Sequence, residues 1–327
     1  SNISERTERG LSLPARRDPL RPLRVTSMRT LSKSDFKTAR SCDAKLYYRE
    51  LGFPSTKDDS PYLALLAEGG YMVEAMAKLQ FPEGIALTYG RDAVADAAAT
   101  MEHLAKENVT LFEATLLVGN RLARADIIRK RGNAVDLIEV KAKSISMAEN
   151  AERLAGGKPN VFRKMTRPYG VSATWRDYLE DVAFQHALLK SLLPNATVRP
   201  FLFLVDKSSV TISEGLSRNF RIVRETKAGG AQRVHHVEFI GDAEQVRAEK
   251  LLALIDVTAE VADLAGDVEA AVVRFESSLH PELRKLPADL SVQCRDCEYC
   301  VSDDEERNGF RECWGALADV RPSVLEL

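Results

Sequence analysis

Apolar residues recur at helical spacing along much of the chain. After Leu31, Ser32 is a suitable N-cap, and Phe36, Ala39 and Leu46 follow at intervals of three and seven residues. We therefore expect a helix that begins near residue 32. The same type of pattern predicts further helices over residues 62–79, 92–106, 174–193 and 243–278.

Several shorter segments have the composition of β-strands. They are rich in β-branched and other apolar residues and are bounded by turn residues. These segments cover residues 109–119, 121–130, 134–143 and 198–206, and a second hairpin is predicted from 220–226 and 233–240 around Ala228-Gly229-Gly230. Helices that precede, interrupt and follow a mixed sheet indicate an α/β fold.

The most informative turn is Gly132-Asn133, which lies between two alternating strands. A two-residue loop of this type is typical of a tight β-hairpin. With this loop, Arg131 pairs with Ala134, and the pairs continue outward in the same register. Asp126 then lies directly opposite Glu139, with Cβ atoms about 5 Å apart.

Two acids and one amine are predicted to meet on one face of this hairpin. Lys141 is two residues after Glu139, so both project from the same side of their strand. Facing carboxylates repel unless a cation lies between them, and their hard oxygen ligands favour Mg²⁺ or Mn²⁺. Lys141 would orient or deprotonate an attacking water, or offset charge on a phosphate. The alternative is a solvated face on which Lys141 only pairs with a carboxylate.

The order of these residues resembles the PD-(D/E)xK superfamily, and specifically its RecB-like nucleases. In that family a strand aspartate, a Glu-x-Lys pair and a downstream helical glutamine follow one another, as Asp126, Glu139, Lys141 and Gln185 do here. The chain has Leu189 where the family often has a tyrosine, so a role for that tyrosine does not carry over. The resemblance implies a restriction-endonuclease-like α/β core, with a mixed central sheet flanked by helices. It also implies a Mg²⁺- or Mn²⁺-dependent deoxyribonuclease in which the four matching residues are catalytic.

The same resemblance implies which residues complete the metal site. Asp126 and Glu139 are its main ligands, and Val140 beside Glu139 contributes to it. RecB-like enzymes place a further ligand on an early helix, for which Glu74 is the candidate, and Glu113 lies on the strand before Asp126. For Glu74 the alternative is a solvent-facing helical residue, and for Glu113 it is a surface position.

Five cysteines are present, and four of them lie close together near the end of the chain. Tight CxxC spacing indicates metal binding rather than disulfides, and zinc is the usual metal for four such cysteines. However, one cysteine before the core and the others after it resembles iron–sulfur nucleases of the AddB type and of CRISPR adaptation, and an uncharacterised bacterial RecB-like family. The resemblance implies a [4Fe–4S] cluster that joins the N- and C-terminal segments, held by Cys42, Cys294, Cys297 and Cys313, with Cys300 as the spare. A buried Cys42 with a separate zinc site in the tail is the alternative, and the choice between Cys300 and Cys313 stays open.

Basic residues follow the predicted hairpin and crowd the loop after it. They are Arg121, Arg124, Arg129, Lys130, Arg131, Lys143, Lys158, Arg163, Lys164 and Arg167. Phe162 and Tyr169 lie among them, and aromatic faces stack on unpaired bases while cations bind phosphates. These residues predict a nucleic-acid partner, namely DNA with single-stranded ends. A solubilising charged loop is the alternative.

The composition is that of an ordinary globular protein. Apolar residues make up 45 %, the formal net charge is −2, and no run approaches the roughly 20 apolar residues of a membrane span. We expect a cytoplasmic protein without a membrane partner. A polyanion would have to bind a local basic patch, because the chain as a whole is not basic.

The chain divides into a short extension and one large domain. Residues 1–27 are rich in Arg, Pro and Ser and are expected to be a disordered extension or tag. A RecB-like nuclease domain follows over residues 28–327, with a helical N-terminal part (28–105), a catalytic core (106–242) and a helical, cysteine-rich C-terminal part (243–327). Members of the uncharacterised family usually continue further. We therefore expect a fragment, with room for a further C-terminal domain or a helicase, repair or defence partner.

The leading hypothesis is a RecB-like exonuclease that hydrolyses DNA. A non-catalytic nucleic-acid-binding scaffold that keeps the fold and the cluster is one alternative. An RNA-processing nuclease is another, because no residue distinguishes the sugar. The choice between exo- and endonucleolytic cleavage also stays open.

Overall fold

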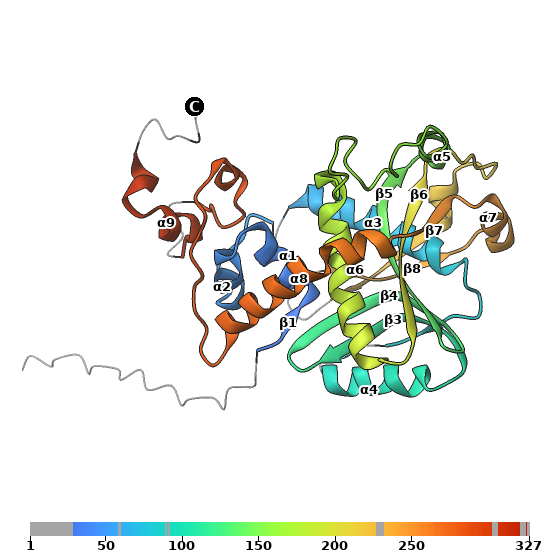
Figure 1. Cartoon of the computed structure of the whole chain (residues 1–327), viewed down its shortest axis with the longest axis horizontal. Coiled ribbons are helices and arrows are strands. Elements are labelled where there is room, and N and C mark those ends of the chain that lie inside the picture. The colour runs from blue at the N-terminus through green and yellow to red at the C-terminus, as the bar shows by residue number, and fades with distance from the viewer. Residues whose placement is uncertain are drawn as a thin grey trace, which may run out of the picture.

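The computed structural model describes residues 29–57, 60–88, 90, 92–226, 232–302, 307–320 and 325 (Figure 1). The extension predicted over residues 1–27 and the turn at Ala228-Gly229-Gly230 lie outside these ranges. A mixed sheet with helices packed against it forms the body of the protein. This architecture confirms the predicted α/β class.

Within the described residues the central sheet has seven strands, of which six follow the order β2-β3-β4-β5-β6-β9, while β1 pairs with β4. The strands are β1 (Leu31–Ser32), β2 (Ile85–Ala86), β3 (Asn108–Val118), β4 (Arg121–Arg131), β5 (Ala134–Ile145), β6 (Thr197–Asp206) and β9 (Leu252–Asp256). The β3–β4, β4–β5 and β6–β9 pairs are antiparallel, and the β1–β4, β2–β3 and β5–β6 pairs are parallel. The predicted second hairpin is present as a separate antiparallel pair of β7 (Phe220–Thr226) and β8 (Gln232–Phe239).

The helices lie between these strands in the chain and after them. They are α1 (Lys33–Ser41), α2 (Ala44–Glu50), α3 (Pro61–Lys78), α4 (Ala93–Leu104), α5 (Met147–Ala155), α6 (Ala173–Leu192), α7 (Ala243–Glu249), α8 (Thr258–Leu279) and α9 (Gly309–Trp314), with short 3-10 helices η1 (Leu216–Asn219), η2 (Val292–Asp296) and η3 (Gly315–Asp319). The predicted N-cap is confirmed, since the Ser32 side chain accepts a hydrogen bond from the Asp35 backbone N–H. In the described residues no helix has the length and apolar composition needed to cross a bilayer.

Alternation along the central strands separates two apolar layers. Ile128 and Leu137 pack in one layer with α6 and α8, whereas Ile127 and Ile138 pack in the other with the end of α3. Successive strand residues point to opposite faces of a sheet, so a strand covered on both faces is apolar almost throughout. This explains why the hairpin strands carry adjacent isoleucines and leucines around the few acids that they contain.

Two of the predicted helices are interrupted in the structure. The helix predicted over residues 243–278 is wrong between α7 and α8, because Lys250 takes a left-handed backbone (φ 48°) and the apolar run after it forms β9 beside β6. A short apolar run cannot be assigned to helix or strand from periodicity alone. The first predicted helix divides at Cys42, whose extended backbone (φ −170°) separates α1 from α2.

Candidate active site

The β4–β5 hairpin has the predicted register. Paired residues run from Arg131 and Ala134 at the turn to Ile127 and Ile138. The next positions along the two strands are Asp126 and Glu139, and the pairing of β4 with β5 ends before them. Asp126 Oδ2 instead accepts a hydrogen bond of 2.7 Å from the backbone N–H of Val140. The two predicted acids therefore lie where the strands stop pairing.

The edge of β4 that β5 leaves is used by β1. β3 pairs with β4 on both sides of Asp126, from Arg121 to Ala125 and from Ile127 to Arg131. β1 must therefore lie along the opposite edge of β4, the one that β5 occupies near the turn. Leu31 pairs with Arg121 there, and α1 starts directly afterwards with Lys33. The start of α1 is thus brought to the point where the strands separate, next to Glu139.

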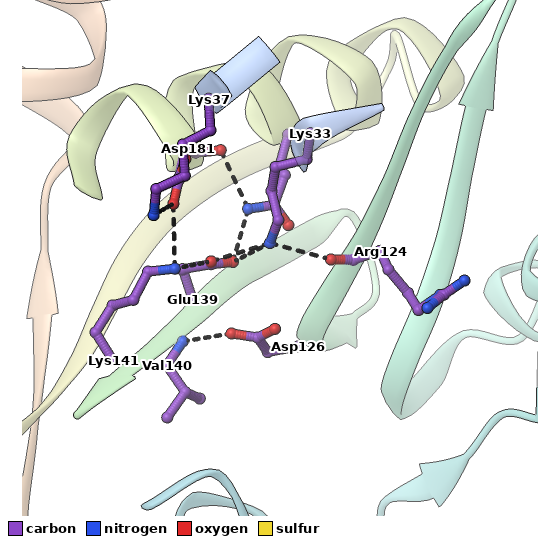
Figure 2. Close-up of polar contacts among 9 residues, drawn as sticks. Lys33, Lys37, Arg124, Asp126, Glu139, Val140, Lys141 and Asp181 are labelled. Carbon is purple, nitrogen blue, oxygen red and sulfur yellow. Dashed lines mark hydrogen bonds and ion pairs between the residues drawn. The ribbon is translucent and has the colours of Figure 1, made fainter. Parts of the chain in front are cut away.

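Glu139 is the most heavily bonded residue of the site. Its side chain is 1 % exposed and accepts hydrogen bonds from Lys141 Nζ (2.7 Å to Oε1), Gln185 Nε2 (2.6 Å to Oε2) and Lys33 Nζ (3.0 Å to Oε1 and 3.2 Å to Oε2) (Figure 2). Burial alone would raise the pKa of Glu139. The ammonium groups of Lys141 and Lys33 outweigh that effect and hold its pKa far below the usual range, so Glu139 is an anion.

Asp126 has a different electrostatic environment. Its low-dielectric surroundings raise its pKa to about 7, and the nearby charge of Glu139 adds to the shift, although Lys33 and Lys141 oppose it. The side chain still reaches solvent in part. One of the two acids is thus firmly ionised, and the other gains or loses its proton near neutral pH.

The structure also brings two residues to the site that the sequence pattern did not identify. Asp181 on α6 is buried, and its Oδ2 lies 3.1 Å from Lys141 Nζ. It precedes Gln185 by four residues, so both project from one face of the helix, which is a signal that the sequence contained. Lys33 follows an N-cap serine, and no sequence pattern pointed to its contact with Glu139.

Lys141 is held as a cation by its neighbours. Burial lowers the pKa of a lysine, but the charges of Glu139, Asp181 and Asp126 outweigh it here and raise the pKa of Lys141 well above its ordinary value. The side chain is 20 % exposed. Its ammonium is therefore fixed in position, protonated and still within reach of solvent.

Glu74 and Glu113 form a second acidic group beside Asp126. Lys78 Nζ contacts both carboxylates, at 2.6 Å and 2.8 Å. The pKa of Glu74 is raised to about 8, first by burial and then by its hydrogen bond to Glu113, and the charge of Asp126 contributes. In the β3–β4 register Glu113 lies opposite Asp126. Glu74 and Glu113 are therefore joined to each other through Lys78, and Glu74 is not an ordinary solvent-facing helical residue.

The backbone of Glu113 is strained. Its φ is 58°, a left-handed conformation that is uncommon for a residue with a side chain and costs about 1–3 kcal/mol. It interrupts a ladder that otherwise continues in one register from Phe112 to Ala114. Strain of this kind persists where the surroundings fix it, and functional sites are frequent among such places.

The donor atoms suit a hard divalent cation. Carboxylate oxygens come from Asp126, Glu139, Glu74 and Glu113, and Mg²⁺ and Mn²⁺ prefer oxygen ligands. In addition, Gln185 Oε1 is buried and accepts no hydrogen bond within the described part of the chain. Even so, across the described ranges no three His, Cys, Asp or Glu side chains form a group that could hold a metal ion as they stand. Instead, the ammonium groups of Lys33, Lys141 and Lys78 form ion pairs with carboxylates of this set.

Three of the predicted cysteine ligands, Cys42, Cys297 and Cys313, pack against one small cluster at a second place in the fold. Cys42 directly follows α1. Burial is the main cause that raises the pKa of its thiol, and the charges of Cys313 and Cys294 add to this shift. Cys42 in turn contributes to the raised pKa of Cys297. Cys300 is exposed. We call Cys42, Cys294, Cys297 and Cys313 the thiol group.

Aromatic residues surround the thiol group. Cys42, Cys297 and Cys313 pack against a small buried cluster that contains Tyr48 and Tyr299. The hydroxyl of Tyr48 lies 3.1 Å from Cys313 Sγ. The N- and C-terminal parts of the domain are therefore in contact here, beside α2 and α9 and away from the central sheet (Figure 1). Four cysteines are the donor set of iron–sulfur clusters and of structural zinc sites, but within the described residues these side chains do not form a group that could hold a metal ion as they stand.

Most of the predicted nucleic-acid-binding cations pair within the protein. The pairs are Arg121 with Glu269 and Glu276, Arg129 with Asp136, Arg131 with Glu83, and Arg163 with Glu260 and Asp263. Lys130 donates to the carbonyl oxygen of Lys106, and Lys143 lies over Trp175. Each of these side chains already has a partner within the protein, and it would have to give up that contact to bind a phosphate.

Only part of the basic loop, residues 158–169, is exposed as the predicted contact with nucleic acid requires. Phe162 is 0 % exposed and packs against Trp175, so the prediction that it stacks on bases is wrong. Its apolar ring is more stable in the core than beside a solvated loop. Tyr169 is 40 % exposed, and Arg167 lies over its ring at 5.5 Å. The exposed cations of this loop are Lys158, Lys164 and Arg167.

Comparisons with known proteins add little to this geometry. No family model matches the chain, and no curated protein matches it. Among solved structures it is similar to the crystal structure of a "putative exonuclease" from Eubacterium rectale, with a TM-score of 0.39 and 11 % identity, over 87 % of this chain and 96 % of that chain. A similarity this low carries no argument, so the functional conclusion depends on the residues themselves.

Proposed function

We propose that the chain is a metal-dependent nuclease that hydrolyses DNA phosphodiester bonds in the manner of RecB-like exonucleases. The observation that carries this proposal is the convergence of Asp126, Glu139, Lys141 and Gln185 where the hairpin strands separate. These residues come from two strands and one helix, and they meet in the order and with the residue types of that nuclease class. A solvated hairpin face does not account for a glutamate that is 1 % exposed and holds three donors.

The proposed cation ligands are Asp126 and Glu139, with Val140, Glu74 and Glu113 completing the site. A bound Mg²⁺ or Mn²⁺ would polarise the phosphoryl oxygen and lower the pKa of the attacking water. The buried Gln185 orients Glu139 through its 2.6 Å hydrogen bond. This bond joins the carboxylate to α6 in the protein without a bound cation.

Lys141 acts in this proposal as an electrostatic group rather than as a base. The carboxylates of Glu139, Asp181 and Asp126 raise its pKa above the ordinary value, so it carries its proton at neutral pH in the metal-free protein. Asp181 anchors its ammonium at 3.1 Å. A fixed positive charge beside the reacting phosphate stabilises the negative charge that develops during hydrolysis.

We further propose that the thiol group holds a [4Fe–4S] cluster, with zinc as the alternative metal. Its role would be structural, since it lies apart from the carboxylates and would link the start of the domain to its end. Cys42, Cys294, Cys297 and Cys313 are the proposed ligands. The exposed loop with Lys158, Lys164, Arg167 and Tyr169 is the proposed contact for single-stranded DNA ends.

Cleavage assays on purified protein test the proposal. We expect Mn²⁺-dependent cleavage of DNA by the wild type and its loss in Lys141→Ala. Lys106→Ala is the matched control, because Lys106 is exposed near the turn of the same hairpin and its side chain contacts His103, outside the site. Equal activity in all three proteins indicates contamination and removes the support for catalysis. Cleavage of RNA but not DNA would indicate an RNA-processing nuclease, and binding without cleavage would indicate a non-catalytic module.

A further inference from the structure

Lys33 is a second lysine of the site, and it reaches Glu139 from a different element than Lys141 does. It is the first residue of α1, and its Nζ lies 3.0 Å and 3.2 Å from the two oxygens of Glu139 (Figure 2). A further contact of 3.4 Å joins it to the carbonyl oxygen of Arg124 on β4. The ammonium thus contacts both oxygens of one carboxylate at the gap between β4 and β5.

The charge of Lys33 acts on both acids of the site. Burial would lower the pKa of its ammonium, but Glu139 and Asp126 outweigh it and raise that pKa. Lys33 also opposes the upward shift of the pKa of Asp126. One ammonium therefore offsets two carboxylates that would otherwise repel each other, which is the electrostatic task of a divalent cation in this place.

The two lysines differ in what holds them. Lys141 contacts Asp181 at 3.1 Å as well as Glu139, so it keeps an anchor when Glu139 turns toward another cation. The ion pair of Lys33 is with Glu139, and its other contact is the long one to the Arg124 carbonyl. Lys33 is therefore the cation that can leave with the smaller loss of contacts.

We propose that Lys33 is a built-in counter-ion of Glu139 that a divalent cation displaces when it binds. This inference rests on the proposed function, because it requires Asp126 and Glu139 to hold that cation. It also explains why the described residues contain several converging carboxylates but no preformed metal-binding group. The lysines offset the charge of the carboxylates until metal arrives, and the metal must compete with Lys33 for Glu139.

Mn²⁺ titration calorimetry on the full chain tests this competition. Because Lys33→Met removes the competing charge and keeps most of the side-chain length, we expect it to bind Mn²⁺ at least about tenfold more tightly than the wild type. Lys37→Met is the matched control. Lys37 is one turn further along α1 and lies 3.6 Å from Asp181 rather than against Glu139, so the expected change is about twofold or less. Unchanged or weaker Mn²⁺ binding by a folded Lys33→Met protein overturns the inference.

A labelling experiment on the wild type gives an answer even if Lys33→Met does not fold. Acetylation of lysines by a water-soluble ester is measured by mass spectrometry with and without Mg²⁺. Lys33 is 20 % exposed in its ion pair, so its release should increase its labelling rate several-fold, while Lys37 should change little. An unchanged or lower rate for Lys33 in Mg²⁺ contradicts displacement.

One more variant separates this inference from the proposed function. Asp126→Asn removes a proposed ligand without touching Lys33. If it leaves Mn²⁺ binding intact, the proposed cation site is wrong, and the inference fails with it. If it weakens Mn²⁺ binding while Lys33→Met binds no more tightly than the wild type, the cation site stands and only the role of Lys33 is refuted.

Discussion

The acid–amine centre, formed by Asp126, Glu139, Lys141, Gln185 and Lys33, and the thiol group are both assembled from distant parts of the chain, but they depend on different support. The centre lies between the main sheet and α6, and Glu139 has donors from three elements there. The thiol group lies away from the sheet and packs against a small cluster that includes Tyr48 and Tyr299. Charges at the centre are already compensated by lysines, whereas little apolar surface supports the thiol group. We therefore expect metal at the centre to matter for chemistry, and metal at the thiol group to matter for folding.

Glu139→Gln gives the largest effect that this comparison predicts. Because it removes the negative charge that would hold the cation and align Lys141, cleavage should fall by at least about 10²–10³-fold. The measurement is the initial rate on labelled DNA in Mn²⁺, with circular dichroism to verify the fold. Glu149→Gln, at an exposed position on α5, is the control and should keep full activity. Glu139→Gln activity within tenfold of the wild type would place the chemistry elsewhere.

Cys313→Ser should act on stability instead. Loss of a ligand from a structural metal site removes folding energy, so the melting temperature should fall by about 3 °C or more, the shift expected for about 2 kcal/mol in a chain of this size. Differential scanning calorimetry and metal analysis of the purified protein measure both quantities. Cys300→Ser is the matched control, and its exposed position predicts almost no change. A larger loss of melting temperature and metal in Cys300→Ser than in Cys313→Ser would make Cys300 the ligand and Cys313 the spare cysteine.

A third effect is expected from the titration of Asp126 in metal-free protein. Its folded pKa of about 7 lies above the unfolded value of 3.8, so the folded state binds the proton more tightly. Below pH 3.8 Asp126 therefore has no effect on the free energy of unfolding. Between pH 3.8 and about 7 it lowers this free energy progressively, and above pH 7 the loss stays constant. Asp126→Asn lacks this cost. The difference in melting temperature, variant minus wild type, should rise between pH 5 and 7 and then level off. A difference that is flat or falls over this range contradicts the raised pKa.

The sequence predicted the parts of the site that depend on local geometry. Gly132-Asn133 fixes the hairpin register, and strand alternation sets Glu139 and Lys141 on one face, so their meeting with Asp126 follows from short-range rules. Gln185 required a resemblance in addition, because nothing local relates α6 to the hairpin. The mixed sheet followed from the order of elements, but β9 did not, since its short apolar run fits a buried helix equally well.

The remaining residues depend on tertiary contacts that periodicity does not contain. Lys33 reaches Glu139 only because β1 takes the edge of β4 that β5 leaves. Phe162 belongs to the core although it lies in a basic loop, and Arg163 beside it pairs with Glu260 on α8. In each case a side chain is positioned by a partner far away in the sequence.

The most direct test of the account is the position of a bound cation. Crystals of the protein grown with Mn²⁺ would be measured at a wavelength where manganese scatters anomalously. The account predicts an anomalous peak at about 2.0–2.6 Å from carboxylate oxygens of both Asp126 and Glu139, with Lys33 moved away from Glu139. A peak elsewhere, or a Glu139 carboxylate still held by Lys33 in Mn²⁺-saturated crystals with no peak beside it, would contradict it.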